Sequence, residues 1–295
     1  MGMIDAFHIT KEYSNGKGIF DLTFQVEEGE VFGFLGPNGA GKTTTIRHLM
    51  GFVRADLGEC FIGGKNCWDE ARFIQKKLGY LPGEINLIND MTGDEFIRFA
   101  AEMRELKSMR RANRLIERFE LDTSVKIRKM SKGMKQKVGI ICAFMHNPDV
   151  YILDEPSSGL DPLMQNRFVE LLLEEKDLGK TIFLSSHMFD EVERTCDRIA
   201  IIKEGKLAAI EDAAAVRAQR RKTYIVTFEG NSMAEAFREE PFDVLDVNGA
   251  TATISIKGNL QEFLKTLERY QVVNLDVKTE SLEEVFMHYY GGENQ

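Results

Sequence analysis

The sequence predicts an α/β fold built on a mainly parallel sheet, followed by a smaller α+β domain. Three short apolar runs end abruptly at glycine, acidic or serine residues, and helical segments separate them, which is typical of buried parallel strands covered by helices. The runs are Val31–Leu35, Val150–Leu153 and Thr181–Leu184. Beyond residue 222 the pattern indicates strand, helix, strand, strand, helix, strand, which is the order of a ferredoxin-like unit.

Size and composition exclude several classes of protein. The chain has 295 residues, 43% of them hydrophobic, which is enough for one large and one small packed domain. Its formal net charge of -9 disfavours general nucleic-acid binding, because phosphate backbones attract basic surfaces. The N-terminus lacks a signal-peptide pattern, and no window approaches about 18 uninterrupted apolar residues, so no segment is expected to span a membrane. The four cysteines form no CxxC pair and are expected to be reduced thiols.

A helical insertion is predicted between the first two apolar strands. Met91–Arg104 has helical spacing, and Thr92 and Glu95 form a capping box at its start. One face of this helix is expected to carry Phe96, Phe99, Ala100 and Met103. The insertion is placed at about residues 84–146, within a first domain of residues 1–215.

The second domain is placed at residues 222–295. Its predicted strands are Thr223–Phe228, Phe242–Val247, Thr251–Ile256 and Val272–Lys278. Asn248-Gly249 is a strong hairpin signal between the middle two strands. The second helix is expected to place four apolar side chains on one face, namely Leu260, Phe263, Leu264 and Leu267. Ser281 and Glu284 predict the cap of a final short helix.

A phosphate-binding loop joins the first strand to a helix predicted over Thr43–Met50. Residues 36–43 fit the pattern G-x-x-x-x-G-K-[ST], in which glycines allow backbone amides to approach phosphate oxygens closely. Lys42 supplies a positive charge to the β and γ phosphates, and the Thr43 hydroxyl is a ligand for magnesium. The following helix points its positive end at the phosphates. The predicted ATP-binding residues here are Gly36, Pro37, Asn38, Gly39, Ala40, Gly41, Lys42, Thr43 and Thr44.

Two carboxylates follow the second apolar strand. Asp154 is placed to hold a magnesium ion, directly or through water. Glu155 is placed to accept a proton from the attacking water or to orient it. Beside a phosphate-binding loop, this pair predicts ATP hydrolysis rather than ATP binding alone.

Further motifs resemble those of the ABC ATPases. Met130–Gln136 resembles the signature of that family, usually Leu-Ser-Gly-Gly-Gln, and Tyr151–Pro156 looks like its second nucleotide motif. Ser157–Asp161 looks like its D-loop, which makes Asp161 a candidate for the ATP site. His187 follows a strand as the switch histidine of the family does, and the resemblance implies that it contacts the γ phosphate and holds the catalytic geometry with Glu155. The resemblance covers about residues 1–210.

The signature also has a physical basis in this sequence. Ser131 is a good N-cap for the apolar helix that follows, and a helix N-terminus suits an anion. The resemblance implies that Ser131 and Gly133 contact the γ phosphate of ATP held by the opposite subunit, in a head-to-tail homodimer or with a paired nucleotide-binding subunit. Lys132 and Met134 depart from the common pattern. Tyr13 resembles the aromatic residue that stacks on adenine.

The clearest departure from the family lies in residues 79–84. This segment resembles the Q-loop, whose glutamine reaches magnesium and the attacking water, but here the position holds Gly83, with Glu84 next to it. Two interpretations remain open. Either Glu84 supplies the missing oxygen to magnesium, or Glu84 is solvated and the site works without that contact.

The resemblance implies an ATP-binding and Mg2+-dependent ATP-hydrolysing subunit of an ABC transporter, most like those of ABC-2 type multidrug or antibiotic exporters. Its implied partner is a separate integral-membrane permease, which places the chain peripherally on the cytoplasmic face of the membrane. An importer subunit remains an alternative, as does a soluble ABC ATPase acting on ribosomes. A DNA-repair ATPase is disfavoured, because the interval between Lys42 and Asp154 is too short for a long coiled coil.

Overall fold

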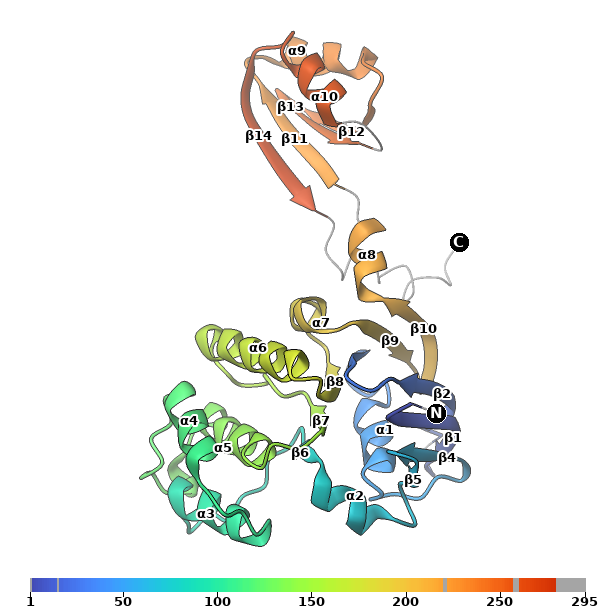
Figure 1. Cartoon of the computed structure of the whole chain (residues 1–295). Coiled ribbons are helices and arrows are strands. Elements are labelled where there is room, and N and C mark those ends of the chain that lie inside the picture. Colours follow the sequence, from blue (N-terminus) through green and yellow to red (C-terminus); the bar gives the residue numbers. More distant parts are fainter. Residues whose placement is uncertain (1, 15, 220–221, 257–259, 280–295) are drawn as a thin grey trace. The chain divides into compact units, whose positions relative to one another are not determined.

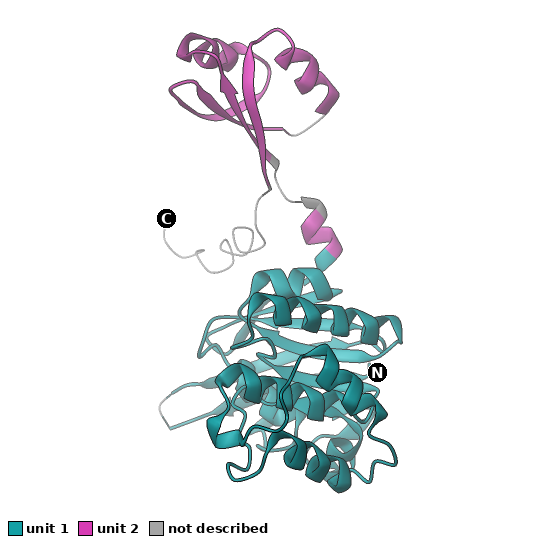
Figure 2. Ribbon diagram, turned by 90° about the vertical axis from the view of Figure 1, so that its left-hand side faces the viewer, with its two compact units in different colours: residues 1–213 teal, residues 214–295 magenta. Residues whose placement is uncertain are grey.

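The chain forms two compact units, residues 1–213 and 214–295 (Figure 2). The computed structural model describes residues 2–14, 16–219, 222–256 and 260–279. The first unit ends at Ala213, whereas the sequence predicts that the first domain ends at residue 215. The predicted helix cap at Ser281 and Glu284 lies outside the described residues.

The centre of the first unit is a six-stranded sheet with the strand order β10-β9-β3-β8-β7-β6. The strands are β3 (Val31–Leu35), β6 (Gly79–Leu81), β7 (Val150–Asp154), β8 (Thr181–Ser186), β9 (Arg198–Lys203) and β10 (Lys206–Asp212). All neighbours pair in parallel except β10, which is antiparallel to β9. All residues of β3, β7 and β8 are buried, which is why these strands are continuous apolar runs in the sequence.

A second, antiparallel sheet lies on one side of the parallel sheet (Figure 1). Its strand order is β2-β1-β4-β5, with β1 (Ile4–Glu12), β2 (Gly18–Val26), β4 (Leu57–Ile62) and β5 (Lys65–Asn66). Aromatic rings join the two sheets: the ring centroid of Phe24 on β2 is 5.7 Å from that of Phe32 and 5.6 Å from that of Phe34, both on β3. This shared core makes a rigid support for the loops at the ends of β3, β7 and β8.

Helices cover the parallel sheet, and three of them form the predicted insertion. The helical elements of the first unit are α1 (Lys42–Leu49), α2 (Ala71–Lys77), α3 (Gly93–Met103), α4 (Arg110–Arg118), the 3-10 turn η1 (Ile127–Lys129), α5 (Lys132–Phe144), α6 (Pro162–Asp177) and α7 (Phe189–Thr195), and α8 (Ala213–Gln219) begins at the last residue of this unit. Figure 1 shows α3, α4 and α5 gathered on the side of the sheet away from β1, β2 and β4. In the described residues, no helix is long and apolar enough to cross a bilayer.

The capping box of α3 is confirmed, and the four apolar residues predicted to share a face lie on the more exposed side of the helix. The Thr92 amide donates to the Glu95 carboxylate at 2.7 Å, and the Glu95 amide donates to the Thr92 hydroxyl at 3.3 Å. The buried residues of the helix are Gly93, Ile97 and Ala101, whereas Phe99 and Met103 are 40% and 70% exposed. The reason is close packing at Gly93, where a Cβ atom would lie only 2.9 Å from the methyl carbon of Met130. The helix therefore packs inward along Gly93, Ile97 and Ala101, which are spaced four residues apart.

The second unit has the predicted ferredoxin-like order. Its strands are β11 (Lys222–Phe228), β12 (Asp243–Asn248), β13 (Thr251–Ser255) and β14 (Val272–Thr279), and they form one antiparallel sheet of order β12-β13-β11-β14. The helical elements are α9 (Asn231–Ala236), the turn η2 (Phe237–Glu239) and α10 (Leu260–Leu267). In α10, Phe263 and Leu267 are buried, but Leu260 and Leu264, which were predicted to share their face, are 44% and 45% exposed.

Candidate active site

The phosphate-binding loop lies between the end of β3 and the start of α1. Gly39 and Gly41 have φ angles of +82° and +112°, which residues other than glycine rarely adopt. At Gly36 a Cβ atom would lie 2.5 Å from the carbonyl oxygen of Ile202. The N-cap of α1 is Gly41, which offers no side chain to the first amides of the helix. These amides are therefore available to an anion, and the helix dipole favours one there.

A cavity of about 270 Å³ opens beside this loop. Among its lining residues are predicted site residues, namely Tyr13, Pro37, Asn38, Gly39, Gly41, Lys42, Thr43, Thr44 and Glu155. Tyr13 is 37% exposed, so its ring is accessible at the cavity. Gly36 and Ala40 are buried and do not line the cavity. Lys17 and Gly18 also line the cavity, and the sequence analysis missed them. The Tyr13 amide donates to the Lys17 carbonyl, so a tight turn brings these two residues back beside Tyr13.

Lys42 and Glu155 meet at the base of the cavity. The Lys42 ammonium is 3.1 Å from Glu155 Oε1 and donates to the carbonyl oxygen of Gly36 at 2.6 Å. Lys42 is only 6% exposed, so its charge requires this compensation. The loop backbone and one carboxylate thus hold the cation in place at the phosphate-binding loop.

Thr43 and Asp154 bring hard oxygen donors together. The Thr43 hydroxyl donates to Asp154 Oδ2 at 2.8 Å, and the Ser185 hydroxyl donates to Asp154 Oδ1 at 2.5 Å. Asp154 is 1% exposed, and two neighbouring hydroxyls fix its orientation. A hydroxyl and a carboxylate suit Mg2+, which usually keeps waters and takes one or two carboxylates plus phosphate oxygens. Within the described residues, no group of three or more His, Cys, Asp and Glu side chains is placed to hold a metal ion.

The register of β7 and β8 brings Glu155 and His187 together. Asp154 pairs with Ser185 in the parallel ladder, so the residues that follow each strand emerge side by side. His187 Nδ1 is 2.5 Å from Glu155 Oε2, and the histidine side chain is 50% exposed. Glu155 has a φ angle of +49°, an uncommon conformation for a glutamate. The β7–β8 pairing thus directs the carboxylate toward both Lys42 and His187.

The remaining predicted site residues do not line this cavity. Ser131 caps α5 by accepting from the Met134 amide at 3.2 Å, and Asp161 caps α6 by accepting from the Met164 amide at 3.0 Å. Both residues are exposed, as is Glu84. The side chains of these three residues are therefore accessible at the surface of this copy.

Gly133 has a local packing role that the sequence analysis missed. A Cβ atom at this position would lie 2.6 Å from the carbonyl oxygen of Gly159, so the start of α5 lies tightly against residues 157–161. The Lys132 ammonium donates to the Ser158 hydroxyl at 3.0 Å, and the buried Gln136 side chain donates to the Pro156 carbonyl at 2.7 Å. The signature segment is therefore bonded to the loop that follows Glu155.

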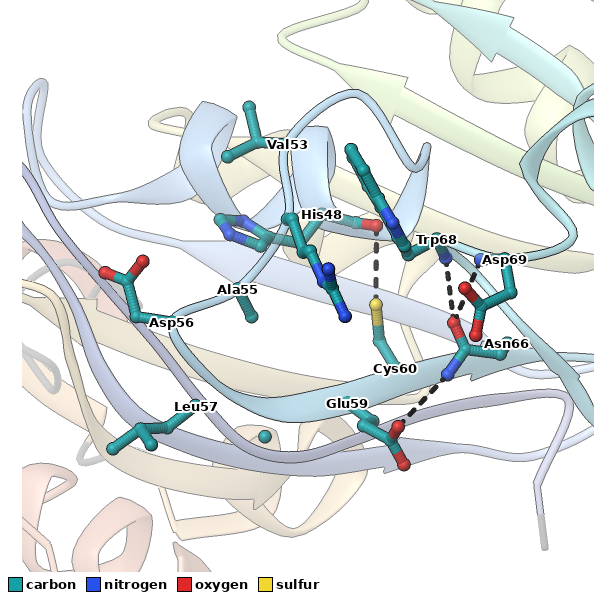
Figure 3. Close-up of a pocket in the computed structure, with 12 residues that line it drawn as sticks. His48, Val53, Ala55, Asp56, Leu57, Glu59, Cys60, Asn66, Trp68 and Asp69 are labelled. Carbon is teal, nitrogen blue, oxygen red and sulfur yellow. Dashed lines mark hydrogen bonds between the residues drawn. The ribbon is translucent and has the colours of Figure 1, made fainter.

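A larger cavity of about 570 Å³ is separate from the predicted site (Figure 3). Its walls come from the end of α1, from residues 53–58 and from the β4–β5 hairpin. It includes His48, Cys60 and Trp68 but none of the predicted nucleotide or metal residues. Size alone therefore does not identify the nucleotide site; the chemistry of the lining residues does.

Known proteins of one family are similar to this chain. The family model described as "ABC transporter" matches residues 19–158. An uncharacterised ABC transporter ATP-binding protein of Methanocaldococcus jannaschii is 33% identical over 276 residues, covering 91% of this chain and 95% of the relative. The linearmycin resistance ATP-binding protein LnrL of Bacillus subtilis and the bacitracin transport ATP-binding protein BcrA of Bacillus licheniformis are each 31% identical, and each comparison covers 98% of both chains.

Solved structures show the same likeness. A structure described as the ATP-binding subunit of an ABC transporter has a TM-score of 0.68 and 35% identity, and covers 74% of this chain and 92% of that one. The dimeric structure of MJ0796, described as a bacterial ABC transporter cassette, has a TM-score of 0.65 and 25% identity, and covers 72% of this chain and 99% of that one.

Proposed function

Since this chain belongs to the family of ABC transporter ATP-binding proteins, we propose that it hydrolyses ATP with Mg2+ to drive export through a separate membrane permease. The observation that carries the ATPase proposal is the convergence of Lys42, Glu155 and His187 at the phosphate-binding loop. A protein that only bound nucleotide would not need a carboxylate held between a lysine and a histidine there.

The proposed chemistry assigns one task to each group. The free amides at the start of α1 and the Lys42 ammonium bind the phosphates. A water oxygen attacks the γ phosphorus while the bond to the bridging β–γ oxygen breaks, so ADP and inorganic phosphate leave. Glu155 accepts the proton from that water, and His187 holds the carboxylate. Thr43 and Asp154 would hold a magnesium ion, which would neutralise charge on the phosphates when bound.

The site proposed here is completed by a second copy. Ser131, Gly133 and Asp161 are accessible yet lie outside the cavity that contains Lys42. In a head-to-tail dimer the free amides at the start of α5 would contact the γ phosphate bound to the other copy. The dimeric description of a solved relative supports this arrangement.

Export is favoured by relatives that match the whole chain. LnrL and BcrA are described as proteins of linearmycin resistance and bacitracin transport, and both match the C-terminal unit as well as the ATPase core. The Nod factor export ATP-binding protein I of Burkholderia thailandensis is 36% identical over 211 residues. We place the chain at the cytoplasmic face of the membrane, bound to its permease.

The Glu155→Gln variant tests the proposed chemistry. It should bind ATP normally but hydrolyse it at least about a hundredfold more slowly, because an amide cannot accept the water proton. It should also accumulate as an ATP-bound dimer in size-exclusion chromatography. Glu170→Gln, which changes an exposed glutamate on α6, serves as the control and should hydrolyse ATP at the wild-type rate.

Unchanged hydrolysis in Glu155→Gln would remove Glu155 from the proposed reaction. Purification of the wild-type chain from native membranes tests the transport part. A multi-span membrane protein in the purified complex supports it, whereas ribosomal proteins in its place would contradict it.

A further inference from the structure

A second glutamate lies buried behind the hydrolytic pair. Glu191 is in α7, the helix that follows His187, and is 4% exposed. The Ser186 hydroxyl donates to Glu191 Oε2 at 2.8 Å, and the Met188 amide donates to the same Ser186 hydroxyl at 2.9 Å. Ser186 and Met188 flank His187, so the Glu191 carboxyl group holds the histidine loop through the Ser186 hydroxyl, which in turn holds the Met188 amide.

The same carboxyl group also faces the loop that follows Glu155. The hydroxyl of Ser157, which is 4% exposed, is directed at the Glu191 carboxyl group and at the sulfur of Met188, 3.6 Å away. Glu191 Oε1 has no hydrogen bond of ordinary geometry in the described part of the chain. A small rotation of the Ser157 hydroxyl from Met188 toward Oε1 would satisfy this oxygen and join the two loops.

The surroundings of Glu191 balance its two protonation states. The pKa of the Glu191 carboxyl group is raised to about 7, because burial and the nearby Glu155 charge raise it by more than the Ser186 and Ser157 hydroxyls and His187 lower it. Cys196, at the end of α7, is the other titratable group that interacts with Glu191; burial raises the pKa of that thiol to about 12, so it is neutral. The charge of Glu191 therefore changes near neutral pH.

We propose that Glu191 is a positioning residue whose ionised carboxylate accepts from both Ser186 and Ser157, and so holds His187 and Glu155 in the geometry for hydrolysis. This inference rests on the proposed ATPase function. Protonation converts one acceptor oxygen into a donor, so the neutral acid does not accept two hydroxyl hydrogen bonds in the same way. The two loops are then free to move apart, and turnover falls while ATP binding at the phosphate loop remains.

The test compares turnover at saturating ATP and Mg2+ between about pH 6 and pH 8.5 for the wild-type chain and Glu191→Gln. Glutamine has the shape of the glutamate but the hydrogen-bonding capacity of the neutral acid. The ratio of wild-type to variant turnover should rise from near one at low pH to about tenfold at high pH, the size expected for one hydrogen bond to a charged group. Since His187 is present in both proteins, the ratio isolates the effect at position 191. The dissociation constant for ATP should not change.

Two further variants separate positioning from folding. Asp190→Asn removes an exposed charge from the same helix and should follow the wild-type pH profile. Ser157→Ala should reproduce part of the loss at high pH, and adding Glu191→Gln to it should cause less than an additive further loss, because both changes remove the contact between Ser157 and Glu191.

A ratio that stays constant over this pH range would overturn the role of Glu191, as would fully additive losses in the double variant. A wild-type chain that hydrolyses no ATP at any pH would instead overturn the proposed function on which this inference rests.

Discussion

Gly83 brings the chain backbone against the proposed magnesium site. A Cβ atom at this position would lie 3.1 Å from Asp154 Oδ2 and 3.2 Å from its carboxyl carbon. In this chain, glycine stands at the position that resembles the glutamine of the Q-loop. The backbone itself therefore lies close to the Asp154 carboxylate there. The neighbouring Glu84 is exposed, so its carboxylate is free to turn toward the nucleotide or to remain in solvent.

The two interpretations of Glu84 differ in their magnesium dependence. If Glu84 is a magnesium ligand, Glu84→Ala should lower turnover several-fold and raise the magnesium concentration at half-maximal rate, because one oxygen donor is lost. Gly83→Gln in that background should restore part of the rate; full recovery is not expected, because its Cβ atom would crowd Asp154. Glu102→Ala, an exposed glutamate on α3, is the control. A magnesium titration of Glu84→Ala that overlays the wild-type curve would leave Glu84 as a solvated residue.

At the level of elements, a buried network ties the helical insertion to the core. Glu175 on α6 is 2% exposed, and it accepts from Arg111 on α4 and, at 2.7 Å, from the Tyr151 hydroxyl on β7. Arg111 also donates to the carbonyl oxygen of Phe144 at the end of α5, at 2.8 Å. Burial and the adjacent Glu175 raise the pKa of the Tyr151 hydroxyl, so it stays a donor. One carboxylate therefore links α4, α6 and the strand that carries Asp154.

Removal of one partner from this network should cost more than removal of a surface pair. Arg111→Met leaves the Glu175 charge uncompensated in the interior, so the free energy of unfolding should fall by about 3–5 kcal/mol. Tyr151→Phe removes one hydrogen bond and should cost about 1 kcal/mol. Arg98→Met breaks an exposed pair on α3, 2.7 Å from Asp94, and should cost no more than about 0.5 kcal/mol. Urea unfolding measures all three; equal costs for Arg111→Met and Arg98→Met would contradict the proposed structural role.

For the whole molecule, the distribution of the predicted site residues is the basis for our proposal that two copies complete each ATP site. The phosphate loop, Asp154, Glu155 and His187 meet within one copy, whereas the exposed start of α5 at Ser131 lies outside their cavity. In the arrangement that we propose, a head-to-tail pair presents each α5 start to the opposite phosphate loop, so each copy completes the site of the other.

Mixing two inactive variants tests this arrangement. Lys42→Ala should bind ATP weakly, because the phosphates lose their cation. Ser131→Arg should bind ATP normally but not hydrolyse it, because the bulky side chain blocks the opposite site. An equal mixture should recover at most about a quarter of the wild-type rate, since half of the dimers are mixed and each of those has one intact site. Ser108→Arg, at an exposed serine, controls for the added charge. Normal hydrolysis by Ser131→Arg alone would exclude the head-to-tail model.

The sequence by itself determined the features that depend on short-range physics. The positive φ angles at Gly39 and Gly41 follow from the spacing of the phosphate loop, and the capping box at Thr92 follows from residues three apart. Fully buried strands were recognisable because both of their faces are apolar. The ferredoxin-like order of the second unit was readable from alternating strands and the Asn248-Gly249 turn, and its core residues then pair as that order requires.

Only the tertiary structure decided which distant residues meet. Glu155 and His187 are 32 positions apart, and their 2.5 Å contact depends on β7 and β8 being neighbours in register. The inward face of α3 depends on the backbone that packs against Gly93, and no periodicity within the helix reports that neighbour. Glu191 is similar to many helical glutamates until Ser157 and Ser186 close around it and remove it from water. Strand order, packing distance and burial are set by contacts between segments far apart in the chain, so a local pattern of residues cannot encode them alone.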